Sequence, residues 1–120
     1  RELVKKRLEE VAKSTCAMYG AECELEYFFG YPPVVNHPAQ TERVLRLAEA
    51  RFGSNMVHKL DPLMAGEDFS VYLERIPGCF IFVGAGNETI RAPHHHPLFD
   101  LDERALQTSD DLLYDLAVKR

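Results

Sequence analysis

A break at Gly30-Tyr31-Pro32-Pro33 constrains the fold of this 120-residue chain more than any other feature. Proline lacks a backbone N–H and restricts the residue before it, so two consecutive prolines end a helix or strand and form a stiff connection. The character of the chain also changes there: the strand-like segment before the break has one polar face, whereas the part after it contains an apolar run at residues 79–83. The sequence therefore predicts two unequal pieces, residues 1–30 and residues 31–120, joined by a hinge.

The first piece has the pattern of one helix followed by one strand. Four side chains recur at the three- and four-residue spacing of a helix face, namely Val4, Leu8, Val11 and Thr15. Gly20 stands where the C-terminus of a helix favours glycine. Next, apolar side chains on one side alternate with glutamates on the other, namely Cys23, Leu25, Tyr27 and Phe29 with Glu22, Glu24 and Glu26. This alternation predicts a strand with one wet face, as in an antiparallel sheet. One helix and one strand are too little to fold alone.

The second piece has the pattern of helices around at least one buried strand. A helix is expected over residues 38–52, capped by Gly53, with Val44, Leu45, Leu47 and Ala48 facing inward. The run Cys79-Phe80-Ile81-Phe82-Val83 is apolar throughout, which is typical of a strand buried on both faces. Residues 56–60 are expected to form a short further strand. The predicted fold class is therefore α/β.

Two more helices complete the second piece. Gly66 is expected to open a helix that ends at Pro77-Gly78, with Phe69, Tyr72, Leu73 and Ile76 on one stripe. The last helix is expected after a capping box in which Asp100 is the N-cap and Glu103 reaches back to it. Its buried side is expected to carry Ala105, Leu112, Leu113, Leu116 and Ala117.

Composition excludes several classes of protein. Hydrophobic residues make up 46% of the chain and charged residues 28%, as in a globular domain rather than a disordered one. The formal net charge of −5 argues against a nucleic-acid partner, which needs a clustered basic surface. No apolar run is long enough to span a membrane. Cys16, Cys23 and Cys79 show no Cys-x-x-Cys spacing, so we expect buried free thiols and a cytoplasmic location.

Three consecutive histidines, His94, His95 and His96, lie between Pro93 and Pro97. Imidazole is the commonest protein ligand for zinc and related metals, and flanking prolines restrict the backbone that carries it. Adjacent residues cannot all point at one ion, so one or two of the three would serve. The alternative is a polar loop with incidental histidines, and composition alone favours that alternative.

The two acids that follow Gly66 also have two interpretations. Glu67 and Asp68 stand at the expected start of a helix, where acids complement the helix dipole. In the functional interpretation, Glu67 faces a cavity and bonds a substrate group or a metal ligand. Local sequence alone favours the dipole interpretation.

Other chemistry-bearing residues match no motif. Gly84-Ala85-Gly86-Asn87 is not a phosphate loop, because no helix is expected there and no Gly-Lys-Ser/Thr follows. Ser70, Thr108 and Ser109 lack a glycine elbow, so a serine hydrolase is unsupported. His37 and His58 are isolated, and we expect them at the surface or packed.

Five short motifs occur in an order that matches one family. They are Tyr31-Pro32-Pro33-Val34-Val35-Asn36, Gly66-Glu67-Asp68-Phe69-Ser70, Ile76-Pro77-Gly78, His95-His96-Pro97-Leu98-Phe99-Asp100 and Asp102-Glu103-Arg104-Ala105-Leu106. Through these motifs the whole chain resembles the C-terminal part of a family of metal-dependent amidohydrolases and metallopeptidases. That family includes hippurate hydrolase, N-acyl-amino-acid deacetylases and plant indole-acetyl-amino-acid hydrolases.

The resemblance implies a fold and a reaction. Such proteins have a zinc-exopeptidase-like catalytic domain, with helices on a mixed sheet, and an inserted α+β lid domain that often forms dimers. Residues 1–30 would be the last helix and strand of the lid, and residues 31–120 the C-terminal portion of the catalytic domain. The family hydrolyses the amide bond of N-acyl amino acids with a water activated by two divalent metal ions, which here could be manganese, zinc, cobalt or nickel.

The resemblance also implies roles for two residues. The family's last metal ligand opens a His-x-Pro element, which maps onto His95, and Glu67 becomes a substrate-binding residue or a neighbour of the metal ligands. The family's other ligands, including a cysteine and the glutamate general base, match nothing here. No catalytic residue is therefore assigned, and this chain by itself is expected to be inactive.

The chain begins at Arg1 without a methionine and is in helical rhythm from Glu2, so we expect a piece of a longer protein. Its partners would be a small N-acyl amino acid, the N-terminal portion of the same enzyme, and a second copy through the lid. One alternative is a non-catalytic oligomerisation or interaction module that reuses the fold. Another is simple metal binding through residues 94–96, for storage or sensing.

Overall fold

The computed structural model describes residues 1–119 and divides the chain into two compact units. The first unit is Arg1–Gly30 and the second begins at Tyr31, so the division falls at the break in the sequence. In the part of the chain that the structure describes, no helix is long and apolar enough to cross a membrane.

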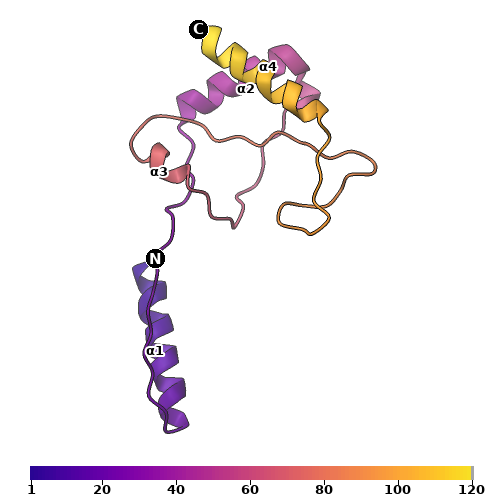
Figure 1. Cartoon of the computed structure of the whole chain (residues 1–120). Coiled ribbons are helices and arrows are strands. Elements are labelled where there is room, and N and C mark those ends of the chain that lie inside the picture. Colours follow the sequence, from indigo (N-terminus) through magenta and orange to yellow (C-terminus); the bar gives the residue numbers. More distant parts are fainter. Residues whose placement is uncertain (120) are drawn as a thin grey trace. The chain divides into compact units, whose positions relative to one another are not determined.

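The first unit is a helix, α1 (Glu2–Met18), followed by a turn and an extended segment that runs back along it (Figure 1). The predicted helix and its glycine stop are confirmed. Gly20 adopts a φ of 65° and donates its N–H to the Ala17 carbonyl, and the Ala21 N–H reaches the Cys16 carbonyl at 2.9 Å. This pair of hydrogen bonds satisfies carbonyls at the end of α1 and reverses the chain.

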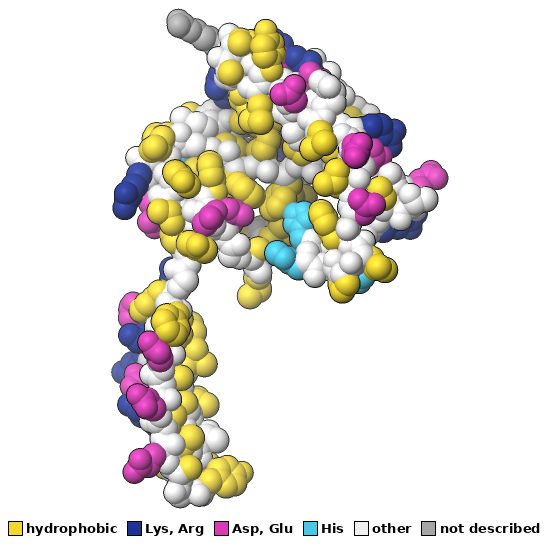
Figure 2. Space-filling view, in the orientation of Figure 1, with side chains coloured by type: hydrophobic (Ala, Val, Ile, Leu, Met, Phe, Trp, Pro, Cys, Tyr) yellow, Lys and Arg dark blue, Asp and Glu magenta, His cyan; other side chains and the backbone are white. Residues whose placement is uncertain are grey.

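The predicted apolar face of α1 is exposed in this unit. The side chains at Val4, Leu8, Val11 and Thr15 are all exposed. Figure 2 shows apolar side chains along one side of α1 and charged side chains along the other. Residues 22–29 are extended but form no strand, because a strand needs a second one to exchange backbone hydrogen bonds with. No second extended segment of this unit pairs with them.

The second unit is built on two packed helices, α2 (Pro38–Phe52) and α4 (Arg104–Val118). The prediction of α2 is confirmed from its proline at the first turn to Gly53, whose φ of 89° favours glycine. Val44, Leu47 and Ala48 are buried as expected. The core joins Leu47 and Ala48 to one residue of α4, Leu112; Phe52, Val57, Ile81 and Leu116 pack against it.

A buried carboxylate also joins these helices. The Asp115 side chain is 1% exposed and accepts hydrogen bonds from Arg51 Nε at 2.6 Å and Arg51 Nη2 at 2.7 Å. Lys119 Nζ lies 2.9 Å from the same carboxylate. These cations, Arg51 first and then Lys119, hold the pKa of Asp115 well below its usual range. The charge is therefore retained although the side chain is buried.

The ends of the other two helices differ from the predictions. The helix expected from Gly66 begins only at Ser70 and is short: α3 spans Ser70–Leu73. The capping box expected before α4 is wrong, because Glu103 is the N-cap and makes no side-chain cap bond. Asp102 instead accepts a hydrogen bond from the Arg104 N–H at 3.1 Å and binds the Arg104 guanidinium. That local ion pair replaces the reciprocal cap.

The buried side of α4 is also narrower than predicted. Leu112 is buried and Leu116 half-buried, but Leu113 and Ala117 are exposed. Asp115 is buried, although a pattern of apolar side chains does not predict a buried carboxylate. The apolar pattern does not predict this burial, because Arg51 and Lys119 form ion pairs that compensate the buried charge of Asp115.

No strand is formed among residues 31–119, so the strands expected over 56–60 and 79–83 are absent from the described structure. Residues 54–56 form a short 3-10 turn, η1 (Ser54–Met56). In place of a ladder, the Asn36 side chain bonds the backbone of Phe80 on both sides, donating to its carbonyl at 2.8 Å and accepting its N–H at 2.7 Å. Phe82 is exposed, so this run is not covered on both faces.

We predict that Leu112→Ala lowers the free energy of unfolding by about 2 to 5 kcal/mol, because it removes a buried side chain from the α2–α4 core. Leu113→Ala is the matched control, since its side chain is 63% exposed, and it should change stability by less than about 0.5 kcal/mol. Urea denaturation of both variants measures the difference. Equal losses would contradict the packing of α4.

We further predict that Asp115 stabilises the fold less as the pH falls. Its pKa in the folded chain is lowered from the ordinary value of 3.8, so its contribution is complete above that value and is lost on further acidification. The difference in stability between wild type and Asp115→Asn should therefore shrink below about pH 4. Thermal melts across the pH range test this; Asp110→Asn, on the exposed side of α4, is the control.

Candidate functional site

The three histidines lie in a loop whose backbone is fixed by two turns. The His96 N–H donates to the Pro93 carbonyl at 3.2 Å, and the Phe99 N–H donates to the His96 carbonyl at 2.9 Å. Between these turns His95 adopts a φ of 63°, in the left-handed region. It is the only non-glycine residue of the described chain with a positive φ. Such a conformation is unfavourable for a side chain with a Cβ, so the loop imposes it.

The three imidazoles have different surroundings. The His94 ring lies edge-on to Phe99, with centroids 5.6 Å apart, and 6.4 Å from the His95 ring. His96 Nδ1 accepts the Leu98 N–H at 3.1 Å. The His95 ring makes no hydrogen bond within residues 1–119, and it is exposed. His94 and His96 thus take part in the structure of the loop, whereas His95 is available to a ligand.

Glu67 lies elsewhere in the second unit and is half-buried. Its Oε1 accepts the Phe69 N–H at 3.1 Å, and its carbonyl accepts the Ser70 hydroxyl at 2.5 Å. These bonds hold the turn that leads into α3. Glu67 precedes α3, which has no acid in its first turn, so the helix-dipole interpretation of Glu67 is not confirmed, and a substrate contact stays a prediction.

A hollow of about 350 Å³ lies beside the histidine loop. Its lining includes three titratable or charged side chains, Arg91, His94 and Asp100, among apolar ones. The loop around it is closed by Asn87, whose Nδ2 donates to Asp102 at 2.9 Å, and by the Asp102 N–H, which donates to the Ala85 carbonyl at 2.8 Å. Hydrogen bonds from Arg104, and then from Asn87, keep the pKa of Asp102 well below its usual range.

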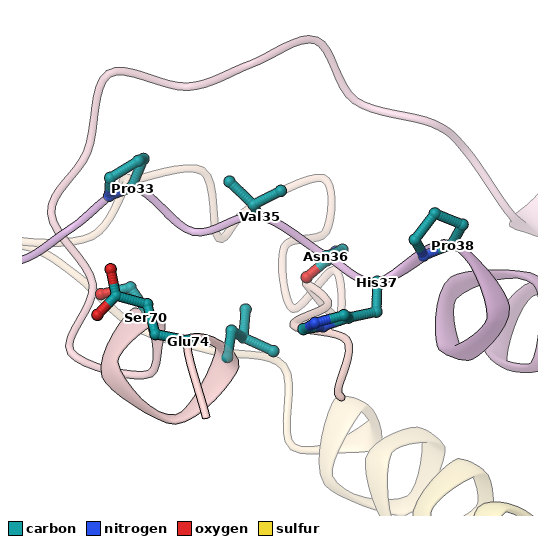
Figure 3. A pocket seen from close by; sticks show the side chains of 8 residues that line it. Pro33, Val35, Asn36, His37, Pro38, Ser70 and Glu74 are labelled. Atoms are coloured by element: carbon teal, nitrogen blue, oxygen red, sulfur yellow. The ribbon is translucent and has the colours of Figure 1, made fainter. Parts of the chain in front are cut away.

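A second hollow, of about 270 Å³, lies between the segment that precedes α2 and the short helix α3 (Figure 3). His37 and Asn36 come from that segment, and Ser70 and Glu74 from the region of α3. The ring atom Nδ1 of His37 accepts the Gly78 N–H at 3.2 Å, and the backbone N–H of His37 donates to the Gly78 carbonyl at 3.0 Å. His37 is thus a packed residue, as one of its two sequence interpretations expected.

The described residues do not form a metal site by themselves. No group of three or more His, Cys, Asp or Glu side chains among residues 1–119 is arranged to hold an ion. The three cysteines are free and half-buried. Neither hollow is lined by His95 or Glu67, so the structure does not bring these two predicted residues together in a pocket.

Comparison with known proteins decides the family. Residues 4–119 match the model of peptidase family M20/M25/M40. The chain belongs to this family. The resemblance seen in the sequence is therefore confirmed, and the M20 family is generally dependent on divalent metal ions.

Several M20-type relatives match nearly the whole chain. A Bacillus subtilis protein named as an amidohydrolase, YhaA, is 41% identical over 120 residues, and the Bacillus subtilis N-acetylcysteine deacetylase is 37% identical over 119 residues. Each match covers 98% of this chain and 30% of the relative. Thermostable carboxypeptidase 1 of Saccharolobus solfataricus is 32% identical over 110 residues, covering 89% of this chain and 27% of the relative.

A solved structure shares the fold. The crystal structure of a protein described as an aminohydrolase, from methicillin-resistant Staphylococcus aureus, superposes with a TM-score of 0.74 at 32% identity. The match covers 95% of this chain and 30% of the solved one. The chain thus spans about a third or less of the length of the M20 relatives it matches.

We predict that His95→Gly makes the chain more stable than His95→Ala by about 1 kcal/mol, because glycine adopts the left-handed conformation without a Cβ penalty. The same pair of substitutions at His94, whose φ is not positive, should show the opposite order. Urea denaturation of the four variants gives the comparison. Alanine equal to or better than glycine at position 95 would contradict the loop conformation.

Proposed function

We propose that this chain is part of a metal-dependent hydrolase that cleaves the amide bond of N-acyl amino acids, with His95 as one metal ligand. Membership of the M20 family supports a hydrolase that uses divalent metal. One relative is named for an N-acyl amino acid, N-acetylcysteine, and others are named as carboxypeptidases. An N-acyl amino acid combines the features of both names, an amide bond and a free carboxylate.

The observation that carries the proposal is the conformation of His95. A residue held in a sparsely populated backbone conformation persists only when its surroundings impose it, and such residues cluster at functional sites. The turns at Pro93 and Phe99 fix the backbone on both sides, while the ring itself is exposed and makes no hydrogen bond within residues 1–119. A metal ligand needs this combination of fixed position and free nitrogen.

His94 and His96 have supporting roles in this proposal. The Leu98 N–H occupies Nδ1 of His96, and the His94 ring packs on Phe99. Both interactions brace the loop that presents His95.

Glu67 is proposed to act near the same site as a substrate-binding residue or as a neighbour of metal ligands. Its Oε1 is held by the Phe69 N–H, which fixes the direction of the carboxylate. Glu67→Gln keeps this acceptor and removes the charge, so a role in binding would appear as a raised KM with little change in kcat. A purely structural role would leave both constants unchanged.

The chain by itself is proposed to be inactive. The described residues hold no cluster of three ligands, so one histidine cannot bind a catalytic pair of metals. The other ligands, the general base and the substrate contacts would come from the N-terminal portion of an M20 fold. On this proposal, residues 1–30 belong to a lid domain that mediates homo-oligomers, residues 31–120 belong to the catalytic domain with its mixed sheet, and the protein acts in the cytoplasm.

The alternative is a non-catalytic oligomerisation or interaction module that reuses the M20 fold. The exposed apolar face of α1 favours it, because such a face is usually covered by protein. The two functions separate in one assay. The complete reading frame is expressed, and hydrolysis of a panel of N-acyl amino acids is measured with manganese, zinc, cobalt or nickel, and after chelation. Hydrolysis that chelation abolishes supports the enzyme; none with any metal supports the module.

We predict that His95→Ala in that complete protein lowers kcat/KM by more than about 100-fold and weakens metal binding, because a direct ligand is lost. His58→Ala removes an exposed histidine outside the loop and is the matched control, with activity retained. Metal content is measured alongside activity. Full activity of His95→Ala in an active protein would overturn the ligand assignment and leave the hydrolase proposal standing.

A further inference from the structure

Two of the three cysteines of this chain lie on either side of the turn that ends α1. Cys16 is in the last turn of the helix and Cys23 follows the reversal. The Ala21 N–H donates to the Cys16 carbonyl at 2.9 Å, which places the returning chain directly over the residue that bears the first thiol. Figure 1 shows the chain running back along α1 from this point.

Burial distinguishes the two cysteines from the residues next to them in the sequence. Cys16 and Cys23 are half-buried, whereas their sequence neighbours on both sides are exposed. An extended segment shows alternate side chains to opposite faces, and Cys23 and Tyr27, which are half-buried, share one face, whereas Glu22, Glu24 and Glu26 on the other face are exposed. Burial, and after it the neighbouring Cys16 side chain, raises the pKa of the Cys23 thiol.

We propose that Cys16 and Cys23 are a redox-active pair that closes an intramolecular disulfide across the turn at Gly20. Its oxidant is a low-molecular-weight disulfide. Both thiols are free in the structure, so the described state is the reduced one. Cys79 belongs to the second unit and is outside the pair. The proposal is independent of the hydrolase function and of His95.

The reaction is two successive thiol–disulfide exchanges. One cysteine thiolate attacks a sulfur of the small disulfide, forms a mixed disulfide and expels one small thiolate. The other cysteine then attacks the protein sulfur of the mixed disulfide, forms the Cys16–Cys23 bond and expels the second small thiolate. The protein loses two electrons and two protons, and the small disulfide is reduced to two thiols. The second step is intramolecular, so it outpaces a second encounter with the reagent.

The bond would fasten the C-terminal turn of α1 to the segment that follows. A disulfide restricts the opening of the loop that it closes. Amide hydrogen exchange at Tyr19, Gly20 and Ala21 should therefore slow on oxidation, because opening of the turn would be restricted.

The full chain and its Cys79→Ser variant are incubated with oxidised glutathione under non-denaturing conditions, and their masses are measured. In Cys79→Ser, we expect the free thiols of Cys16 and Cys23 to disappear. The mass of the chain should fall by that of two hydrogen atoms, and no glutathione adduct should persist. Peptide mapping locates the disulfide. Trypsin leaves Cys16 and Cys23 on one fragment, Ser14–Arg43, and further cleavage after Glu22 separates the two cysteines onto two peptides that only the disulfide joins.

Matched single variants supply the control. Cys16→Ser and Cys23→Ser, each in the Cys79→Ser background, leave one thiol of the pair and should accumulate one glutathione adduct. Stable adducts on both Cys16 and Cys23 of Cys79→Ser, or a bond that forms only in denaturant, would overturn the proposal. A link from Cys79 to either residue in the native full chain, to the exclusion of the Cys16–Cys23 bond, would also overturn it.

Discussion

The second unit depends on a charge buried between its two long helices. Its apolar core is small, with Leu47, Ala48 and Leu112 at the centre, so the Asp115–Arg51 pair is a large part of what joins α2 to α4. Removing one partner of a buried pair leaves the other charge uncompensated, which costs more than the pair contributes. Arg43 adds to the junction, because its Nη2 donates to the Leu116 and Lys119 carbonyls at the end of α4.

Hydrogen bonds that involve side chains hold several extended segments between α2 and α4. The Asn36 side chain binds the Phe80 backbone as a neighbouring strand would, His37 binds the Gly78 backbone with its ring and its own backbone N–H, and the Asn87 side chain donates to the Asp102 carboxylate. These contacts position extended segments without a sheet. The histidine loop connects these extended segments to α4. The position of His95 therefore depends on the α2–α4 junction as well as on the turns within the loop.

The proposed chemistry is divided between the two units. His95 belongs to the second, where a fixed left-handed backbone presents one free imidazole. The proposed thiol pair belongs to the first, where Cys16 and Cys23 lie on either side of the turn after α1. Metal-dependent hydrolysis and thiol oxidation can therefore be tested separately. The chain matches about 30% of the length of its M20 relatives, and the residues that the structure describes hold no group of three metal-ligating side chains.

The sequence by itself determined the boundary pattern near Tyr31, helices α1 and α2 with their terminal glycines, and the family, because periodicity, glycine stops and ordered motifs are local properties of a chain. It could not predict that Asp115 is buried while Leu113 is exposed, or that Asn36 and His37 hold the Gly78–Phe80 backbone. Those outcomes depend on residues 41 to 64 positions away meeting in space. The extended segments show the same limit, because alternation predicts which side chains share a face, whereas a strand exists only where a second one pairs with it.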